Sequence, residues 1–250
     1  MTGHLSIVGL GPGAAGLQTP DASAALAEAT DLVGYLPYLQ RVARSIGQVR
    51  HASDNRVELD RARHALELAA SGRVVAVVSS GDAGVFGMAS AVFEAMEAGP
   101  VGWRQLDVRV VPGISAVFAA AARLGAPLGH DFCAISLSDN RKPWALVLRR
   151  LTAAAQAGFV IALYNPRSRA RPEQLGEALD TLRLTLAPQT LVAFARAVSR
   201  PEEHVEIMAL ADADPLLADM STLVLIGTAE TRSIPRADGT VWLYAPRTAC

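Results

Sequence analysis

Three short apolar runs in the first half of the chain each end in a loop that contains glycine. The pairs of run and loop are Leu5–Gly9 with 9–13, Val74–Val78 with 79–87, and Leu106–Val111 with 112–115. Helical patterns separate the runs, so we predict parallel strands joined by helical crossovers. The carboxyl ends of parallel strands meet at one edge of a sheet, where open α/β sheets bind ligands. The first half therefore predicts an α/β domain whose three loops form a small-molecule site.

The second half predicts a different sheet. Its runs Leu191–Ala195 and Val205–Ala209 are separated by a polar connection too short for a helical crossover, which favours an antiparallel pair and hence a mixed sheet. The breaker-rich segment Gly125–Gly129 is the predicted linker. We expect two α/β domains, 1–124 and 125–250, with the ligand in a cleft between them.

Helix boundaries follow from local signals. Pro20 is suited to a first helical turn. A second helix is expected over Val57–Ala70, with Asp54 or Ser53 as its cap, because its apolar residues recur at spacings of three and four. Further helices are predicted over the two ranges Phe86–Met96 and Ile114–Leu124.

The composition of the chain argues against several classes of protein. The net charge of −1 argues against nucleic acid as a partner. No apolar run reaches the roughly 18 residues that a membrane-spanning helix needs, and the amino terminus lacks a secretory pattern. Cys133 and Cys250 provide neither a disulfide framework nor metal-ligand spacing. We expect a soluble cytoplasmic protein that binds no metal.

The first glycine loop has the G-x-G-x-x-G spacing at Gly11, Gly13 and Gly16, which is typical of dinucleotide sites. In such a site a helix begins at the glycine turn and holds the pyrophosphate. Here Pro12 interrupts the turn, and the predicted helix begins later, near Pro20. A nicotinamide-dependent reductase is therefore disfavoured. The absence of a P-loop lysine also argues against nucleotide phosphoryl transfer.

The glycine loops, taken with one motif from the second half, resemble the tetrapyrrole methylase family. The motifs are Val8–Gly13, Ser80–Gly87, Val111–Ala116 and Leu163–Pro166, in the order and spacing of that family. The resemblance implies two α/β domains, S-adenosylmethionine bound in the cleft between them, a tetrapyrrole substrate and a homodimer.

Other segments are similar to the branch of the family that methylates C17 of precorrin-3B in cobalamin biosynthesis, with an associated ring contraction. These segments are Gly34–Tyr38, Ser53–Glu58, Gly125–Phe132 and Gly227–Arg232. Ala83 stands where many members have proline after the loop aspartate. This departure bears on the rigidity of the loop more than on the identity of its ligand.

The resemblance implies cofactor contacts at eleven positions. They are Gly11, Pro12, Gly13, Ser80, Gly81, Asp82, Val85, Ser115, Ala116, Asn165 and Ala197. Asp82 is the charged member and is expected to contact the cationic amino group of the cofactor. The alternative for Asp82 is a purely local Asx turn within its own loop.

A tetrapyrrole substrate carries many carboxylates, which guanidinium groups pair with well. The basic residues in candidate loops are Arg56, Arg141, Lys142, Arg167 and Arg169, of which Arg56 and Arg167 are the predicted substrate anchors. The alternative for each of them is a solvated surface charge. Ring contraction would require proton transfers, for which a histidine or carboxylate is suitable. His130, Asp131 and Glu58 are the candidate catalytic residues.

Two further hypotheses remain beside methylation at C17. One is another methylase of the same family, acting at a different ring carbon or on uroporphyrinogen. The other is a non-catalytic module that retains the cofactor fold. Binding of S-adenosylhomocysteine separates both from a nicotinamide-dependent reductase, and the position of a transferred label separates the methylases from one another.

Overall fold

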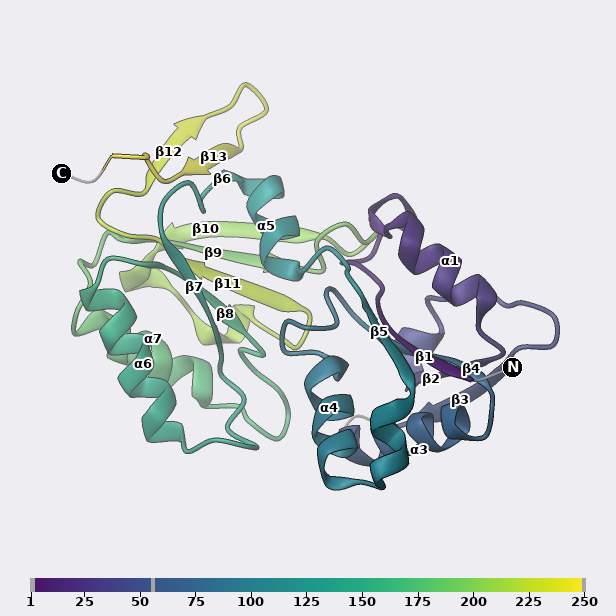
Figure 1. Cartoon of the computed structure of the whole chain (residues 1–250). Coiled ribbons are helices and arrows are strands. Elements are labelled where there is room, and N and C mark those ends of the chain that lie inside the picture. Colours follow the sequence, from purple (N-terminus) through teal and green to yellow (C-terminus); the bar gives the residue numbers. More distant parts are fainter. Residues whose placement is uncertain (1–2, 55–56, 249–250) are drawn as a thin grey trace. The chain divides into compact units, whose positions relative to one another are not determined.

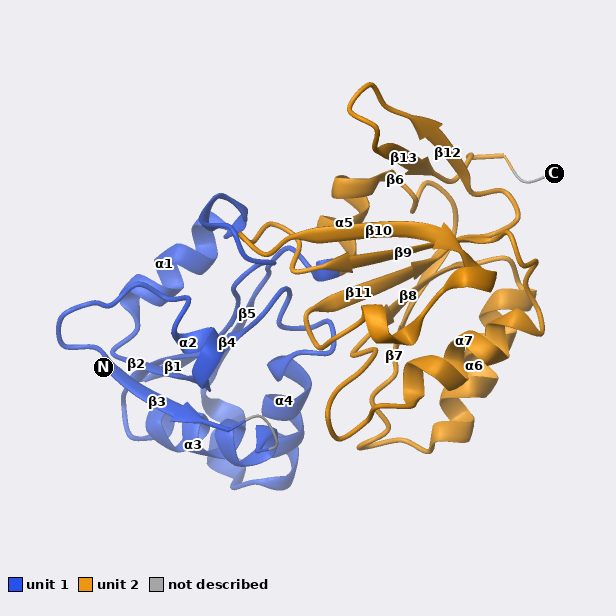
Figure 2. Ribbon diagram, turned by 180° about the vertical axis from the view of Figure 1, so that it is seen from behind, with its two compact units in different colours: residues 1–116 blue, residues 117–250 orange. Residues whose placement is uncertain are grey.

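The computed structural model describes residues 3–54 and 57–248. It divides into two compact units, unit 1 (1–116) and unit 2 (117–250), which Figure 2 colours separately. Each unit contains one sheet of five strands, and a further sheet of three strands is also present. The domain boundary expected after residue 124 stays a prediction.

Unit 1 contains a parallel sheet of five strands, with helices packed on both of its faces (Figure 1). The strand order is β3-β2-β4-β1-β5, and every pair is parallel, which confirms the parallel sheet predicted from the sequence. The elements in chain order are β1 (His4–Gly9), the 3-10 helix η1 (Ala15–Leu17), α1 (Pro20–Glu28), β2 (Asp31–Tyr35), α2 (Leu36–Leu39), β3 (Val49–Ser53), α3 (Glu58–Ala70), β4 (Val74–Ser79), α4 (Met88–Ala98), the 3-10 helix η2 (Val101–Gln105) and β5 (Asp107–Val111).

The central strands of unit 1 are buried on both faces, which explains why their sequences are continuously apolar. In β4, Val75 and Val77 join a core cluster with residues of α3 and α4. Ala76 and Val78 join the cluster on the other face, with residues of α1. Successive side chains of β4 therefore pack alternately into two cores, one on each face of the sheet.

Unit 2 contains the predicted mixed sheet. Its order is β10-β9-β11-β8-β7, in which β9–β10 is antiparallel, as expected, and β7–β8 is parallel. The elements of the region are α5 (Ala116–Leu124), β6 (Gly125–Ala126), β7 (Phe132–Ser136), α6 (Trp144–Gln156), β8 (Val160–Tyr164), α7 (Gln174–Arg183), β9 (Leu191–Arg196), β10 (His204–Ala209), the 3-10 helices η3 (Leu210–Asp212) and η4 (Pro215–Leu217), β11 (Thr222–Ile226), β12 (Arg232–Pro235) and β13 (Val241–Tyr244).

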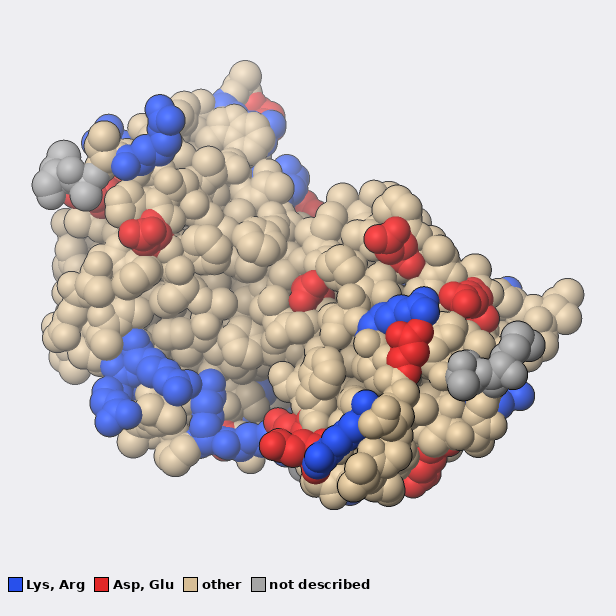
Figure 3. Space-filling view, viewed as in Figure 1, with Lys and Arg blue, Asp and Glu red and all other residues tan. Residues whose placement is uncertain are grey.

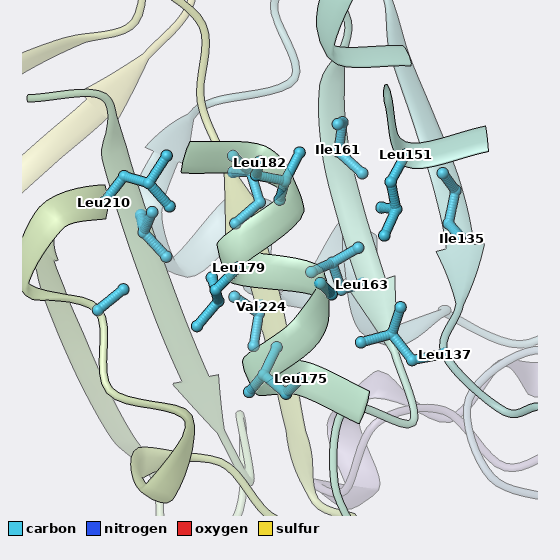
Figure 4. Close-up of a cluster of buried hydrophobic side chains, with 14 of the residues drawn as sticks. Ile135, Leu137, Leu151, Ile161, Leu163, Leu175, Leu179, Leu182, Leu210 and Val224 are labelled. Carbon is cyan, nitrogen blue, oxygen red and sulfur yellow. The ribbon is translucent and has the colours of Figure 1, made fainter. Parts of the chain in front are cut away.

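The main core of unit 2 lies between its five-stranded sheet and the helices α6 and α7. Figure 4 shows Leu175 and Leu179 of α7 beside Leu163 and Val224 of the sheet. Leu151 of α6 belongs to the same cluster and is fully buried. The predicted linker takes part in the small sheet β12-β13-β6, where Gly125 pairs with Leu243.

Two local predictions need correction. The helix expected from Phe86 begins at Met88, because Phe86 has a non-helical φ of +53° and Gly87 is the N-cap. Neither Ser53 nor Asp54 caps α3, which follows Val57 without a side-chain cap. The Ser53 hydroxyl instead accepts a hydrogen bond from Arg61 Nε at 2.7 Å.

The helix expected at Pro20 is present and is capped by the Thr19 hydroxyl, which accepts from the backbone N–H of Ala22 at 3.1 Å. None of the helices in the described residues is long and apolar enough to cross a bilayer.

Candidate functional site

At the carboxyl edge of the unit 1 sheet, the three glycine loops contact one another through backbone atoms. A Cβ on Gly9 would lie 2.7 Å from the nitrogen of Gly113 and 2.8 Å from the oxygen of Gly81. A Cβ on Gly113 would collide with the Gly81 oxygen. The expected convergence of the loops is therefore confirmed, and these glycines are needed because the backbones approach too closely for any side chain.

Two of the loops are also hydrogen-bonded to each other. Gly11 N donates to Gly81 O at 3.0 Å, and Gly81 N donates to Gly11 O at 2.9 Å. Both residues have left-handed backbone angles, with φ of +71° and +67°. Glycine adopts this conformation without the steric cost that other residues meet. The loops after β1 and β4 therefore form one paired unit.

The Asp82 carboxylate joins the third loop to this pair. Its Oδ1 accepts from Gly84 N at 2.8 Å, which is the Asx turn considered above, and its Oδ2 accepts from Gly113 N at 3.0 Å. A carboxylate can accept roughly four hydrogen bonds, so two backbone donors leave capacity for a cationic ligand. Asp82 is also only half-buried. Its surroundings therefore fit the amino group of a methionine-like ligand.

The remaining unit 1 residues of the predicted cofactor set lie around these loops. Gly81 lies against Ser115 and Ala116, because a Cβ on it would be 3.7 Å from Ser115 Cα and 3.6 Å from Ala116 N. Pro12 and Ser115 are buried, whereas Gly13, Ser80 and Val85 are half-buried. The structure thus gathers the unit 1 members at one edge of the sheet.

Arg41 is a site residue that sequence reasoning missed. It lies just beyond Gln40, the C-cap of α2. Its guanidinium donates to Ser80 Oγ at 2.9 Å and to the carbonyl oxygens of Gly11 at 2.8 Å and Leu10 at 3.3 Å. A lone arginine after a four-residue helix carries no periodic signal, so its partners could not be found without coordinates.

The loop after β3 leads to the candidate catalytic residue Glu58, which is half-buried at the start of α3. Arg56, a predicted substrate anchor, lies outside the described residues. The buried Arg61 supports this loop by donating to Ser53 Oγ and to the carbonyl of Asp54. Burial lowers the pKa of the Arg61 guanidinium from its ordinary value. Its position four residues before the buried Ala65 was a detectable signal, since it places a charge on the apolar face of α3.

In unit 2, three strands end at the same edge of the sheet. Strand β7 is parallel to β8, and both β8 and β9 are antiparallel to β11, so β7, β8 and β9 point the same way. Asn165 and Ala197 follow β8 and β9 directly, and their φ angles are +53° and +49°. Left-handed backbone in residues other than glycine is uncommon and is concentrated at functional sites.

Side chains hold this edge together. Asn165 Nδ2 donates to Ser136 Oγ at 2.9 Å. The buried Arg171 donates to the carbonyls of Asn165 at 3.1 Å and Leu137 at 3.3 Å. Burial lowers the pKa of the Arg171 guanidinium from its ordinary value. The predicted substrate anchor Arg167 is half-buried nearby in sequence, and its Nε donates to the carbonyl of Pro172 at 3.3 Å.

His130 and Asp131 lie at the other end of this sheet. Both precede β7, and the Asp131 carbonyl accepts from Val160 N at the amino end of β8. Asn165 follows the carboxyl end of β8, about 15 Å away for a strand of this length. Unit 2 therefore does not bring these candidate catalytic residues together with Asn165 and Ala197. Among the residues that the structure describes, no group of three or more His, Cys, Asp or Glu side chains could hold a metal ion.

Basic side chains gather over α6 and the loop that leads into it (Figure 3). The group comprises Arg141, Lys142, Arg149 and Arg150. Lys142 Nζ donates to the carbonyl of Ser136 at 2.6 Å, so this ammonium is fixed at the carboxyl end of β7. Burial, with the nearby Arg150, lowers the pKa of Lys142.

Three comparisons with known proteins bear on this site. The model of the family "Tetrapyrrole (Corrin/Porphyrin) Methylases" matches residues 4–214. A "Precorrin-3B C(17)-methyltransferase" from Sinorhizobium sp is 54% identical over 247 residues, which cover 99% of this chain and 97% of that protein.

Solved structures give the same picture. The crystal structure of the methyltransferase CobJ superposes with a TM-score of 0.92 at 55% identity, covering 98% of this chain and 100% of the other. A uroporphyrin-III C-methyl transferase from Thermus thermophilus, complexed with S-adenyl homocysteine, has a TM-score of 0.67 at 20% identity, covering 90% and 97%. At that identity the second likeness bears on the fold alone.

Proposed function

Because this chain belongs to the tetrapyrrole (corrin/porphyrin) methylase family, we propose that it methylates C17 of precorrin-3B in cobalamin biosynthesis. S-adenosylmethionine is the methyl donor. The observation that carries the choice of ring carbon is the 54% identity to a precorrin-3B C17-methyltransferase over 99% of the chain. The alignment covers nearly the full length of both proteins, so the likeness extends over both units.

The three joined loops of unit 1 are the proposed core of the cofactor site. Backbone donors and acceptors of Gly11 to Gly13, Ser80 and Gly81 would contact the cofactor, and Asp82 would pair with its amino group. Ser115 and Ala116 lie next to Gly81 and complete this part. Val85, with Asn165 and Ala197 of unit 2, makes up the rest of the proposed set.

Catalysis would come mainly from alignment. When bound, S-adenosylmethionine supplies a methyl group on a sulfonium, which an electron-rich carbon attacks in line. Loops that are already fixed remove the entropy cost of orienting the reactants, and this effect alone can be worth about 7–11 kcal/mol. The carboxyl edge of unit 1 could orient the reactants in this way, because backbone contacts and the Asp82 carboxylate fix all three of its loops.

The substrate-side assignments are part of the same proposal. Arg56 and Arg167 would pair with substrate carboxylates, and the basic group over α6 offers further guanidinium and ammonium groups. Glu58 stays a proposed proton-transfer residue for the associated ring contraction, because its loop lies at the carboxyl edge of unit 1. The positions of His130 and Asp131 at the amino end of β7 give no support to a catalytic role.

We further propose that the protein is a homodimer, as the family resemblance implies. From the composition we propose a cytoplasmic location, and from the breaker-rich segment Gly125–Gly129 the domains 1–124 and 125–250. Light scattering on the purified protein tests the dimer, which would have twice the 26.2 kDa mass of the chain. Cell fractionation tests the location.

Calorimetry and product analysis test the function. We expect S-adenosylhomocysteine to bind with a Kd in the micromolar range and NAD not to bind. With precorrin-3B, or its oxidised lactone, and methyl-¹³C S-adenosylmethionine, NMR should place the label on C17. Label at another carbon would establish a different methylase of the family, and binding without transfer to any tetrapyrrole would establish a non-catalytic module. No binding of S-adenosylhomocysteine would contradict the proposal as a whole.

A further inference from the structure

The Arg41 side chain donates hydrogen bonds to both the loop after β1 and the loop after β4. Its Nη1 donates to Ser80 Oγ at 2.9 Å, in the loop after β4. Its Nη2 donates to the carbonyl oxygens of Gly11 and Leu10 at 2.8 and 3.3 Å, in the loop after β1. The guanidinium therefore spans the two loops that carry most of the proposed cofactor contacts.

Both loops are rich in glycine. They meet through Gly11 and Gly81, which have positive φ angles and are joined by two backbone hydrogen bonds. Glycine loses more conformational freedom on ordering than any other residue, so glycine-rich loops are costly to keep in one shape. A planar guanidinium presents several donors in fixed directions, which makes it well suited to fix several acceptors at once.

The contacts of Arg41 are partly shielded from solvent. The arginine is half-buried, and the hydrogen bonds to Ser80, Gly11 and Leu10 each lie in a partly buried region. Hydrogen bonds from a charged donor contribute more than neutral ones, and shielding from water strengthens them further. The bridge can therefore order the loops before any ligand arrives.

We infer that Arg41 is a positioning residue for the cofactor site: it holds the loops 9–13 and 79–87 in their binding geometry and acts through Gly11 and Ser80. The inference rests on the proposed function, because S-adenosylmethionine is the ligand proposed for these loops. Without the bridge, only a fraction of molecules would have both loops in place, and the apparent affinity falls by that fraction. A saturating cofactor concentration restores the ordered loops.

The binding test compares four proteins by calorimetry with S-adenosylhomocysteine: wild type, Arg41→Gln, Arg41→Lys and Arg44→Gln. Arg44 is exposed three positions further along the chain, so Arg44→Gln makes the same chemical change away from the loops. We expect the Kd to rise about tenfold or more in Arg41→Gln. In Arg41→Lys it should rise about threefold to tenfold, because a single ammonium cannot span both loops as a guanidinium does. Arg44→Gln should match wild type.

Steady-state kinetics separates positioning from general damage. For Arg41→Gln we expect the KM for S-adenosylmethionine to rise with the Kd, while kcat at saturation stays within about threefold of wild type. A variant that was merely less well folded would show the opposite, a lower kcat with an unchanged KM. That result would overturn the inference.

The remaining outcomes are also decisive. Wild-type affinity in Arg41→Gln, with wild-type protein binding normally, overturns the inference and leaves the proposed function intact. Failure of the wild-type protein to bind overturns the proposed function, and the inference with it. Should Arg41→Gln not fold, Arg41→Lys decides the question, since an unchanged Kd there would show that no bridge across the two loops is needed.

Discussion

In unit 1 the backbones of the loops at the carboxyl edge of the sheet contact one another directly, and the side chains of Asp82 and Arg41 add hydrogen bonds between them. In unit 2 the loops at the corresponding edge are joined by hydrogen bonds from side chains. Gly9, Gly81 and Gly113 meet at distances that exclude a Cβ. In unit 2, Arg171 binds the carbonyls that follow β7 and β8, and Asn165 keeps a left-handed backbone without being glycine. The two edges should therefore be sensitive to different kinds of substitution.

The two edges differ in how the free-energy cost of fixing the loop backbone arises. Glycine takes up positive φ angles at no steric cost but leaves the loop flexible in the unfolded chain. A non-glycine residue in that conformation costs about 1–2 kcal/mol, which the surrounding hydrogen bonds must offset. Unit 1 should therefore be intolerant of added atoms, and unit 2 should be intolerant of lost hydrogen bonds.

Gly113→Ala should have the largest effect. Its Cβ would collide with the Gly81 oxygen and lie 2.7 Å from the Gly9 oxygen, so two other loops would have to move. We expect a loss of about 3 kcal/mol in the free energy of unfolding, as overpacked sites show, together with loss of S-adenosylhomocysteine binding. Urea unfolding and calorimetry measure both.

Gly16→Ala is the matched control, because a Cβ on Gly16 meets no atom within 4 Å. It should change stability by less than about 0.5 kcal/mol. Equal effects of the two substitutions would show that close packing of backbones does not distinguish the unit 1 edge.

Arg171→Met should have an intermediate effect. It removes the donors to the carbonyls of Leu137 and Asn165 while keeping much of the apolar volume. The lost hydrogen bonds are partly offset because a buried charge no longer has to be desolvated. We expect a net loss of about 1–2 kcal/mol, measured by urea unfolding. The exposed Arg169 provides the control Arg169→Met, which should be close to neutral; a neutral Arg171→Met would remove the basis for the contrast between the units.

Ser199→Gly should have the smallest effect, and in the opposite direction. Ser199 lies after β9 and has a φ of +67°, so a glycine at this position would relieve backbone strain. This gain should offset the larger conformational entropy that glycine gives the unfolded chain. We expect unchanged stability or a gain of up to about 1 kcal/mol. Ser71→Gly, at a φ of −80°, should be destabilising. Differential scanning calorimetry compares the two, and a destabilised Ser199→Gly would show that the unit 2 backbone is not strained at this position.

Much of unit 1 could be predicted from the sequence, because its signals are local. Each buried strand is a short apolar run, and each loop carries the glycines that its packing requires. The mixed sheet of unit 2 was also predictable, since the short connection between β9 and β10 excludes a helical crossover. The strand β3 was missed because it lies at the edge of the sheet and none of its residues is fully buried.

The parts that could not be predicted depend on contacts between distant residues. Arg41 meets Gly11 and Ser80 across 30 and 39 positions, and no local pattern marks such a partner. His130 and Asp131 are predicted from their chemistry and from their place next to the linker. Their location at the amino end of β7 depends on how the linker enters the sheet, which the sequence does not state.

The bond from Gly113 to the Asp82 carboxylate has a consequence for engineering. With the Gly11–Gly81 pairing, it makes the loops after β1, β4 and β5 interdependent. A designer who exchanged one of these segments for its counterpart from a related enzyme would disturb the other two. The three loops should therefore be exchanged together. Chimeras that exchange all three loops should be more stable than chimeras that exchange only one or two of them.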